Sequence, residues 1–287
     1  MNWHDIVDPN DAELDRLAAE YHIHPLHIED CRHGGQRGKV EEGKGYLFVV
    51  LKPVQVDPDH ELVFHDLDIF LGSDWVITVQ EGNRETCGHI LQQARAAPVL
   101  SASQVLYRIY DGTVDSYLPI MDHIDDVIDG LEERVLQDPD PEVLARIFRT
   151  RRALIELRRI LANTRDLAAH LYRTPSDLIP ADLIPFLRDV YDHVARNLDQ
   201  VETQRDLLSG TMDVYLSSVA NKTNRVMKVL TVVGTIALPA LIISGFFGMN
   251  LKGLPFTDSS QGTAIVTGIM GLTTTVLLAV VWRLGWF

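Results

Sequence analysis

The sequence has little cysteine and a deficit of basic residues. Only Cys31 and Cys87 are cysteines among its 287 residues. So few thiols exclude a disulfide framework and a paired-cysteine zinc motif, and they fit a reducing compartment. There are 26 Lys and Arg against 40 Asp and Glu, so the formal net charge is -14. This acidic balance argues against nucleic acid as a partner and favours cations.

Motifs of soluble enzymes are also missing. The sequence contains no P-loop, no GxSxG and no HExxH. These motifs would supply a phosphate cradle, a nucleophile or a catalytic metal. We therefore expect no catalytic residues and a protein that is not an enzyme.

Charge is absent from two long stretches near the carboxyl end, residues 229–247 and 263–282. Each is close to the roughly 20 residues that a helix needs to cross a bilayer, so the sequence predicts two transmembrane helices. Basic residues flank the spans on one side, whereas the connecting loop holds one lysine and one aspartate. This bias places both termini in the cytoplasm. The amino-terminal residues lack the pattern of a signal peptide, and we expect a multi-pass protein of the inner (plasma) membrane.

The rest of the chain divides by its hydrophobic pattern. Short β-rich runs, YLFVVLKPVQV, LVFHDLDIFLG and WVITVQEG, indicate a cytoplasmic α/β domain over residues 1–97. Helical periodicity then takes over and predicts an antiparallel helical pair within 98–184, formed by residues 103–137 and 143–172. The remaining segments are a stalk (185–228), a first transmembrane helix (229–250), an outer loop (251–262), and a second transmembrane helix with a short tail (263–287).

The predicted helical pair is acidic on its first helix and basic on its second. The charges either neutralise one another across the pair, or the acidic face binds cations. The acidic residues are Asp122, Asp125, Asp126, Asp129, Glu132 and Glu133, and the basic residues are Arg146, Arg149, Arg151, Arg152, Arg158 and Arg159.

The stalk and the first span are expected to form one helix. Pro185 suits a helix start, and no stop signal precedes the first charge-free stretch. Some sixty residues at about 1.5 Å each make a helix roughly 90 Å long. Gly210 and Pro239 interrupt its pattern without ending it. Apolar residues recur along the stalk at nearly seven-residue spacing, which is typical of helices packed side by side; they are Leu187, Tyr191, Val194, Leu198, Val201, Leu208, Met212, Tyr215 and Val219.

Small and polar residues form a stripe along the first span. Two spans cannot enclose an aqueous path alone, so a transport function requires an oligomer with this helix at its axis. Alternatively, the small residues let helices pack closely in lipid. In an oligomer, Asn250 would form a ring of neutral oxygens that suits hydrated Mg²⁺, and Met227, Leu230 and Leu238 would form apolar constrictions. The stripe comprises Asn224, Met227, Thr231, Gly234, Leu238, Leu241, Gly245 and Gly248.

Several motifs resemble those of the CorA-type divalent-cation transporters: IHPLHIED, QRGKVE, FLRDVYDH, VETQRDLLSGTMDVYLSSVANKTNRVMKVLT and GMN. The resemblance implies an α+β membrane protein that forms a funnel-shaped homopentamer in the lipid bilayer. It implies a channel for Mg²⁺, with Co²⁺ or Ni²⁺ as further cargo. Asn250, Met249 and Gly248 match the outer selectivity ring, and Asn224, Met227, Leu230, Leu238 and Gly245 match positions that line the pore.

The resemblance also implies regulatory Mg²⁺ between neighbouring subunits. Asp30 and Asp189 match its carboxylate ligands, and Glu29 and Asp111 match a second nearby site. A dication between opposed carboxylates replaces their repulsion by attraction. Metal would therefore hold the closed ring together, and a fall in internal Mg²⁺ would release it.

Two features depart from the magnesium branch, and the G-x-P of the outer loop, Gly253 to Pro255, resembles the zinc-transporting branch of the same superfamily. Phe247 precedes GMN where the magnesium branch has tyrosine, and the loop carries Lys252 where that branch has an acidic residue. A Zn²⁺ transporter, coupled to protons, is therefore the alternative. Imidazoles suit that metal, and the histidines that could bind it are His22, His24, His27 and His33. A third possibility is a membrane-anchored sensor or scaffold that transports nothing.

Overall fold

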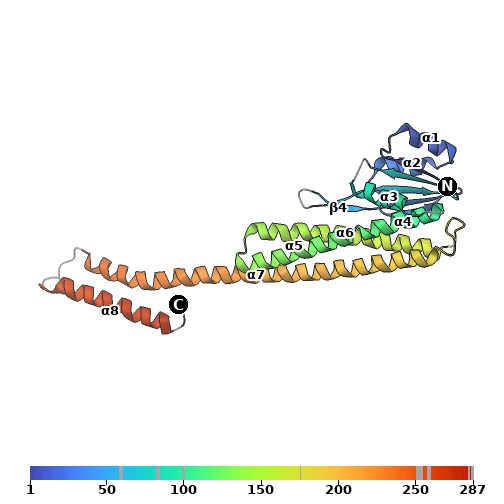
Figure 1. Cartoon of the computed structure of the whole chain (residues 1–287). Helices are drawn as coiled ribbons and strands as arrows, with labels where there is room; N and C mark the ends of the chain where they lie inside the picture. Colours follow the sequence, from blue (N-terminus) through green and yellow to red (C-terminus); the bar gives the residue numbers. More distant parts are fainter. Residues whose placement is uncertain are drawn as a thin grey trace. The chain divides into compact units, whose positions relative to one another are not determined.

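The described residues form a five-stranded mixed sheet, a small two-stranded sheet and eight helices, which divide into two compact units (Figure 1). The computed structural model describes residues 1–57, 61–81, 85–98, 101–174, 176–249, 255–256, 260–283 and 285. The first unit is Met1–Asp213 and the second is Val214–Phe287.

A five-stranded sheet forms the centre of the first unit, in the order β1-β7-β6-β3-β2. β1 pairs with β7 in parallel, and the other neighbours are antiparallel. The three predicted β-rich runs are confirmed, although two of them are each divided into two strands. β1 and β2 lie in segments where the sequence predicted no strand. The strands are β1 (Asn2–Ile6), β2 (Lys39–Glu42), β3 (Leu47–Leu51), β4 (Val54–Val56), β5 (Leu62–Phe64), β6 (Leu67–Leu71) and β7 (Trp75–Gln80).

Helices cover both faces of this sheet. α1 (Ala12–Glu20) and α2 (Pro25–His33) share a buried apolar cluster with one face of β3, β6 and β7. α3 (Glu85–Ala96) packs on α4 (Ala102–Asp115), and α4 lies against β6 and β7. Because both faces are covered, every residue of β3 and β6 is buried, as the continuous apolar runs indicated.

The prediction that the first member of the helical pair is a single helix is wrong. Residues 103–137 form two helices, α4 and α5 (Leu118–Gln137), with Ser116 and Tyr117 between them. Pro119 lies in the first turn of α5, where its missing N–H is tolerated, whereas inside a helix its ring would clash with the preceding turn. The Tyr117 hydroxyl donates to the Lys52 carbonyl at 2.8 Å and so attaches this break to the sheet.

The predicted neutralisation between the acidic and basic helices is also wrong. In the described part of the chain, none of the six arginines makes an ion pair with the acidic residues of α5; Arg158 bonds instead to Glu202 of α7 (Ile184–Phe247). Asp125 and Glu132 of α5 have their partners on α7, whereas Glu133 accepts from Gln137 of α5 itself. Asp125 accepts from Gln200 at 3.2 Å and from Gln204 at 2.8 Å. The basic helix is α6 (Pro141–Arg173), and most of its arginines are exposed.

Gln204 is the most buried polar side chain that bonds α7 to α5. It is 1% exposed and also donates to the Met121 carbonyl at 2.9 Å. We expect Gln204→Ala to lower the free energy of unfolding by about 2 kcal/mol, because it removes two buried hydrogen bonds and leaves acceptors unpaired. Urea unfolding of the detergent-solubilised chain measures this loss. The exposed Ser209→Ala on the same helix is the control, with a change within about 0.5 kcal/mol; equal effects of both variants would contradict the prediction.

A buried ionisable cluster lies beneath the end of α2. Lys52 and Asp66 form an ion pair in which both side chains are nearly enclosed. Asp68, on β6, is 3% exposed, and one of its carboxyl oxygens has no hydrogen-bond partner. Burial raises the pKa of Asp68 to about 7, with Asp66 adding repulsion, while a hydrogen bond with the Cys31 thiol acts in the opposite direction. The fold therefore favours the protonated form of this carboxyl.

The long helix is confirmed. α7 begins at Ile184, directly before Pro185, and contains 64 residues, with Pro239 inside it. In the first half of the stalk, every second residue of the predicted apolar repeat is buried, namely Leu187, Val194 and Val201. The sequence therefore identified both the continuity of this helix and its packing face.

The second unit contains the end of α7 and α8 (Gly262–Arg283). Lys228 donates through Nζ to the Gly285 carbonyl at 3.2 Å, so the end of α8 returns beside the first turns of the predicted span. Both helices are long and apolar enough to cross a membrane. Most of their large apolar side chains are exposed, for example Leu230 at 64% and Leu272 at 68%, which a surrounding bilayer explains.

Candidate metal sites and pore helix

α2 positions the first two predicted metal ligands. His24 caps the helix by accepting from the Leu26 N–H at 3.2 Å, Pro25 occupies its first turn, and Gly34 follows its end at a φ of 58°. Glu29 is exposed on this helix and Asp30 is half-buried. Both carboxylates therefore lie near the end of a short, capped helix that packs on the sheet.

Asp30 is not free in this chain, because its Oδ2 accepts from Lys39 Nζ at 2.7 Å. The same ammonium donates to Glu41 Oε1 at 2.9 Å. Burial lowers the pKa of Lys39, but the hydrogen bonds to Asp30 and Glu41 outweigh it, so the pKa is raised overall. The hydrogen bond from Lys39 likewise lowers the pKa of Glu41. The Lys39 ammonium and the Glu41 carboxylate thus stabilise each other in their charged forms.

The network continues through a buried histidine. His27 Nε2 lies 3.0 Å from Glu41 Oε2, and its Nδ1 lies 2.8 Å from the Tyr46 hydroxyl. Burial is the main reason that the pKa of His27 is lowered. A carboxylate can only accept, so Nε2 carries the proton of the neutral ring and Nδ1 accepts from Tyr46. His27 is therefore a structural residue in this network.

A second group of ligating side chains lies between α4 and α7. Among the residues that the structure describes, one group of three could hold a metal ion: Asp111, Asp115 and His193, whose ligand atoms lie within 4.8 Å of one another. His193 Nε2 is also 3.6 Å from Asp189 Oδ2. Burial raises the pKa of Asp111, and the neighbouring Asp115 adds to the rise. A cation bound here would relieve this repulsion between carboxylates.

This arrangement extends the predicted metal residues. Asp111 lies with Asp115 and His193, two residues outside the predicted set, and Asp189 contacts the group through His193. The missed residues follow at four-residue spacing from Asp111 and Asp189 on helices, and that spacing was the available signal. Glu29 and Asp30 are not part of this group. Their pairing with Asp111 and Asp189 across subunits stays a prediction.

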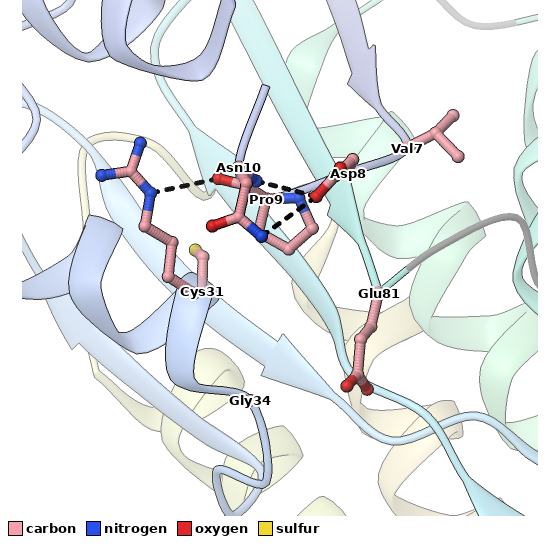
Figure 2. A pocket seen from close by; sticks show the side chains of 8 residues that line it. Val7, Asp8, Pro9, Asn10, Cys31, Gly34 and Glu81 are labelled. Carbon is pink, nitrogen blue, oxygen red and sulfur yellow. Dashed lines mark hydrogen bonds between the residues drawn. The ribbon is translucent and has the colours of Figure 1, made fainter. Parts of the chain in front are cut away.

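A pocket of about 400 Å³ lies beside α2 (Figure 2). Its polar groups are largely engaged with one another: the Asp8 carboxylate accepts from the Asn10 backbone N–H at 2.9 Å and from its Nδ2 at 3.3 Å, and Arg32 donates to the Pro9 carbonyl. Cys31 lines the pocket and has its pKa raised, chiefly by burial. The pocket therefore gives no reactive thiol and none of the predicted metal ligands.

The predicted pore residues lie on one uncovered side of α7. Those within the described part of the chain are all exposed, including Met227 at 56%, Leu230 at 64% and Leu238 at 59%. The covered residues of the span form a different stripe, at Val232, Ile236, Pro239, Ala240, Ile243 and Phe247. The other exposed members of the predicted set are Asn224, Thr231, Gly245, Gly248 and Met249.

Gly248 ends α7 in a close turn. Its N–H donates to the Ser244 carbonyl at 2.9 Å, and a Cβ at this position would lie 3.0 Å from the same oxygen. A larger residue would therefore require the Ser244 carbonyl to shift slightly. Asn250, the central residue of the predicted selectivity ring, and Lys252 lie outside the described residues.

The family model of the CorA-like Mg²⁺ transporter protein matches residues 1–283. The chain belongs to this family. It is 38% identical over 270 residues to the cobalt/magnesium transport protein CorA of Thermotoga maritima, covering 92% of this chain and 77% of that protein. This confirms the prediction of divalent-metal transport with Mg²⁺ as the main cargo, and the CorA-like family is one of transporters rather than of enzymes.

Solved structures support the same assignment. The complete CorA magnesium transporter from Methanocaldococcus jannaschii matches with a TM-score of 0.86 and 25% identity, over 99% of this chain and 91% of that one. The ZntB cytoplasmic domain from Vibrio parahaemolyticus matches with a TM-score of 0.63 and 13% identity, over 76% of this chain and 88% of that one, and so shares the fold. The predicted fold class, a soluble α/β domain followed by a long helix and two membrane helices, is confirmed.

Proposed function

We propose that the chain assembles as a homopentamer in the plasma membrane and conducts Mg²⁺ along an axis lined by α7. The observation that carries this proposal is the position of the stripe from Asn224 to Gly248, on a side of α7 that α8 leaves uncovered. In a single chain these small and polar groups would face lipid, whereas around an axis they would face water and ions. Both termini are proposed to lie in the cytoplasm.

We further propose that cytoplasmic Mg²⁺ regulates this channel by binding between subunits. The carboxylates would come from Asp30 of one subunit and Asp189 of the next, with Glu29 and Asp111 nearby. The grouping of Asp111 with Asp115 and His193 supports a cation site on α4 and α7. Because α7 is one continuous helix from Ile184 to Phe247, a shift at its first turns can reach the span.

The zinc alternative rests on the outer loop, since three of the four histidines named for it make structural contacts. His24 caps α2, His27 bonds to Glu41 and Tyr46, and His33 donates to the Glu29 carbonyl at 2.9 Å. Among the described residues, none of the four belongs to a group that could hold a metal. A non-transporting scaffold is the least supported alternative, because family membership favours transport.

Ion flux tests these functions. Proteoliposomes containing the full chain should take up Mg²⁺, and Asn250→Ala should lower that flux by about tenfold or more, because the ring would lose the oxygens that hold hydrated ions. Gln137→Ala, which removes an exposed carboxamide from α5, should leave flux unchanged.

Parallel uptake assays with Zn²⁺, with and without a proton gradient, separate the alternatives. Zinc uptake that follows the gradient, without magnesium uptake, would replace the proposal by the zinc transporter. Absence of flux for both metals would favour the scaffold.

A further inference from the structure

Lys39 places a positive charge on a carboxylate that the proposed function assigns to regulatory Mg²⁺. Its Nζ lies 2.7 Å from Asp30 Oδ2 and 2.9 Å from Glu41 Oε1. This inference rests on the proposed function of Asp30. We propose that the Lys39 ammonium is an internal cation that Mg²⁺ must displace from Asp30, and that Lys39 thereby sets the Mg²⁺ concentration to which the protein responds.

The position of this ammonium is fixed by the sheet. Lys39 is the first residue of β2 and is the register partner of Val50 on β3. Lys39 and Glu41 are two residues apart on the same strand, so their side chains extend from the same face. The Lys39 side chain is 18% exposed and that of Asp30 is 27% exposed. The pair is therefore less screened than a surface ion pair and needs little further ordering.

The aromatic surroundings stabilise the same position. Lys39 Nζ lies 5.4 Å from the centre of the Phe48 ring, within the range of a cation–π contact. The Phe48 ring also stacks on His27 at 4.7 Å. Lys39 is thus held by two carboxylates and a ring, on elements that the core of the domain keeps in place.

Glu41 allows the ammonium to leave Asp30 without becoming unpaired. Glu41 Oε2 contacts His27 Nε2 at 3.0 Å, while Oε1 accepts from Lys39. If Mg²⁺ takes the Asp30 carboxylate, Lys39 can keep its contact with Glu41. The exchange then replaces one of two ion pairs of Lys39 by a metal bond, so Mg²⁺ competes with a single tethered charge rather than with the whole network.

Removal of the competitor should increase Mg²⁺ sensitivity. We expect Lys39→Met to lower the Mg²⁺ concentration for half-maximal protease protection by about fivefold to tenfold, which corresponds to a half-buried ion pair. The methionine keeps the apolar part of the side chain. Lys44→Met is the matched control, because Lys44 is exposed in the adjacent loop and its loss changes the net charge equally; it should shift the midpoint by less than about twofold.

Glu41→Gln gives a test of opposite sign. The variant leaves Asp30 as the carboxylate partner of Lys39, so the Mg²⁺ concentration for half-maximal protease protection should rise. The glutamine oxygen can still accept from His27. The assay uses the full chain in detergent, titrated with magnesium chloride, with thermal melting in EDTA to confirm folding. If Lys39→Met does not fold, Glu41→Gln decides the test alone, and an unchanged or lower midpoint overturns the inference.

Asp30→Asn distinguishes this inference from the proposed function. If Asp30→Asn leaves Mg²⁺ protection unchanged, the proposed regulatory site is wrong. If Asp30→Asn abolishes protection but Lys39→Met shifts the midpoint no more than Lys44→Met, the site stands and the role of Lys39 is wrong.

Discussion

Asp30→Asn combined with Asp189→Asn is expected to abolish the protection that millimolar Mg²⁺ gives the cytoplasmic part of the chain against protease. In the proposed assembly these carboxylates come from adjacent subunits, and metal turns their repulsion into attraction. Without both, Mg²⁺ has no differential effect on the closed arrangement and cannot shift the population toward it. Limited proteolysis across a magnesium titration measures the effect.

The control for this variant removes the same charge elsewhere. Asp126→Asn with Asp129→Asn changes two exposed carboxylates of α5 and should retain Mg²⁺ protection. Asparagine preserves the size of each side chain, and Lys39 keeps Glu41 as a partner in the variant. Full protection of the Asp30 and Asp189 variant would remove the proposed sensor, and loss of protection in both variants would indicate a general charge effect.

Asp68→Asn is expected to stabilise the fold at neutral and alkaline pH. Its pKa is raised from 3.8 to about 7 in the folded chain, so the folded state binds the proton more tightly than the unfolded state. Stability from this group is therefore greatest below pH 4 and falls as pH rises to about 7. A shift of about 3 units corresponds to roughly 4 kcal/mol, which the variant would recover above pH 7.

Urea unfolding at a series of pH values measures this difference. Between pH 4 and 7 the free-energy difference between Asp68→Asn and the unmodified chain should increase, and above pH 7 it should level off. Asp74→Asn, an exposed change in the loop before β7, should show no such trend. If the difference in unfolding free energy between Asp68→Asn and the unmodified chain did not vary with pH, the raised pKa of Asp68 would be contradicted.

Local pattern alone was enough to predict several elements. The charge-free stretches identified the two spans, the absence of a stop signal predicted α7 as one helix, and the seven-residue spacing predicted the buried face of its stalk. Pro185 marked its start. These features depend on residues that are near one another in the sequence, so periodicity and helix signals report them directly.

Other features depended on contacts that no local pattern contains. β1 was not predicted as a strand, because its pairing partner β7 lies more than sixty residues away. The charged faces of α5 and α6 suggested mutual neutralisation, but packing directs Asp125 toward α7 instead. The break before α5 was readable from Pro119, but the attachment of that break to the sheet was not.

By itself, the sequence determined the two apolar spans, the continuity of the long helix and the likeness to CorA-type transporters. Only the tertiary structure showed that Lys39 forms an ion pair with Asp30, that Asp115 and His193 lie beside Asp111, and that Asp68 is buried. The physical reason is that charge and periodicity are properties of the chain, whereas the partner and the burial of an ionisable group are set by distant segments that folding brings together.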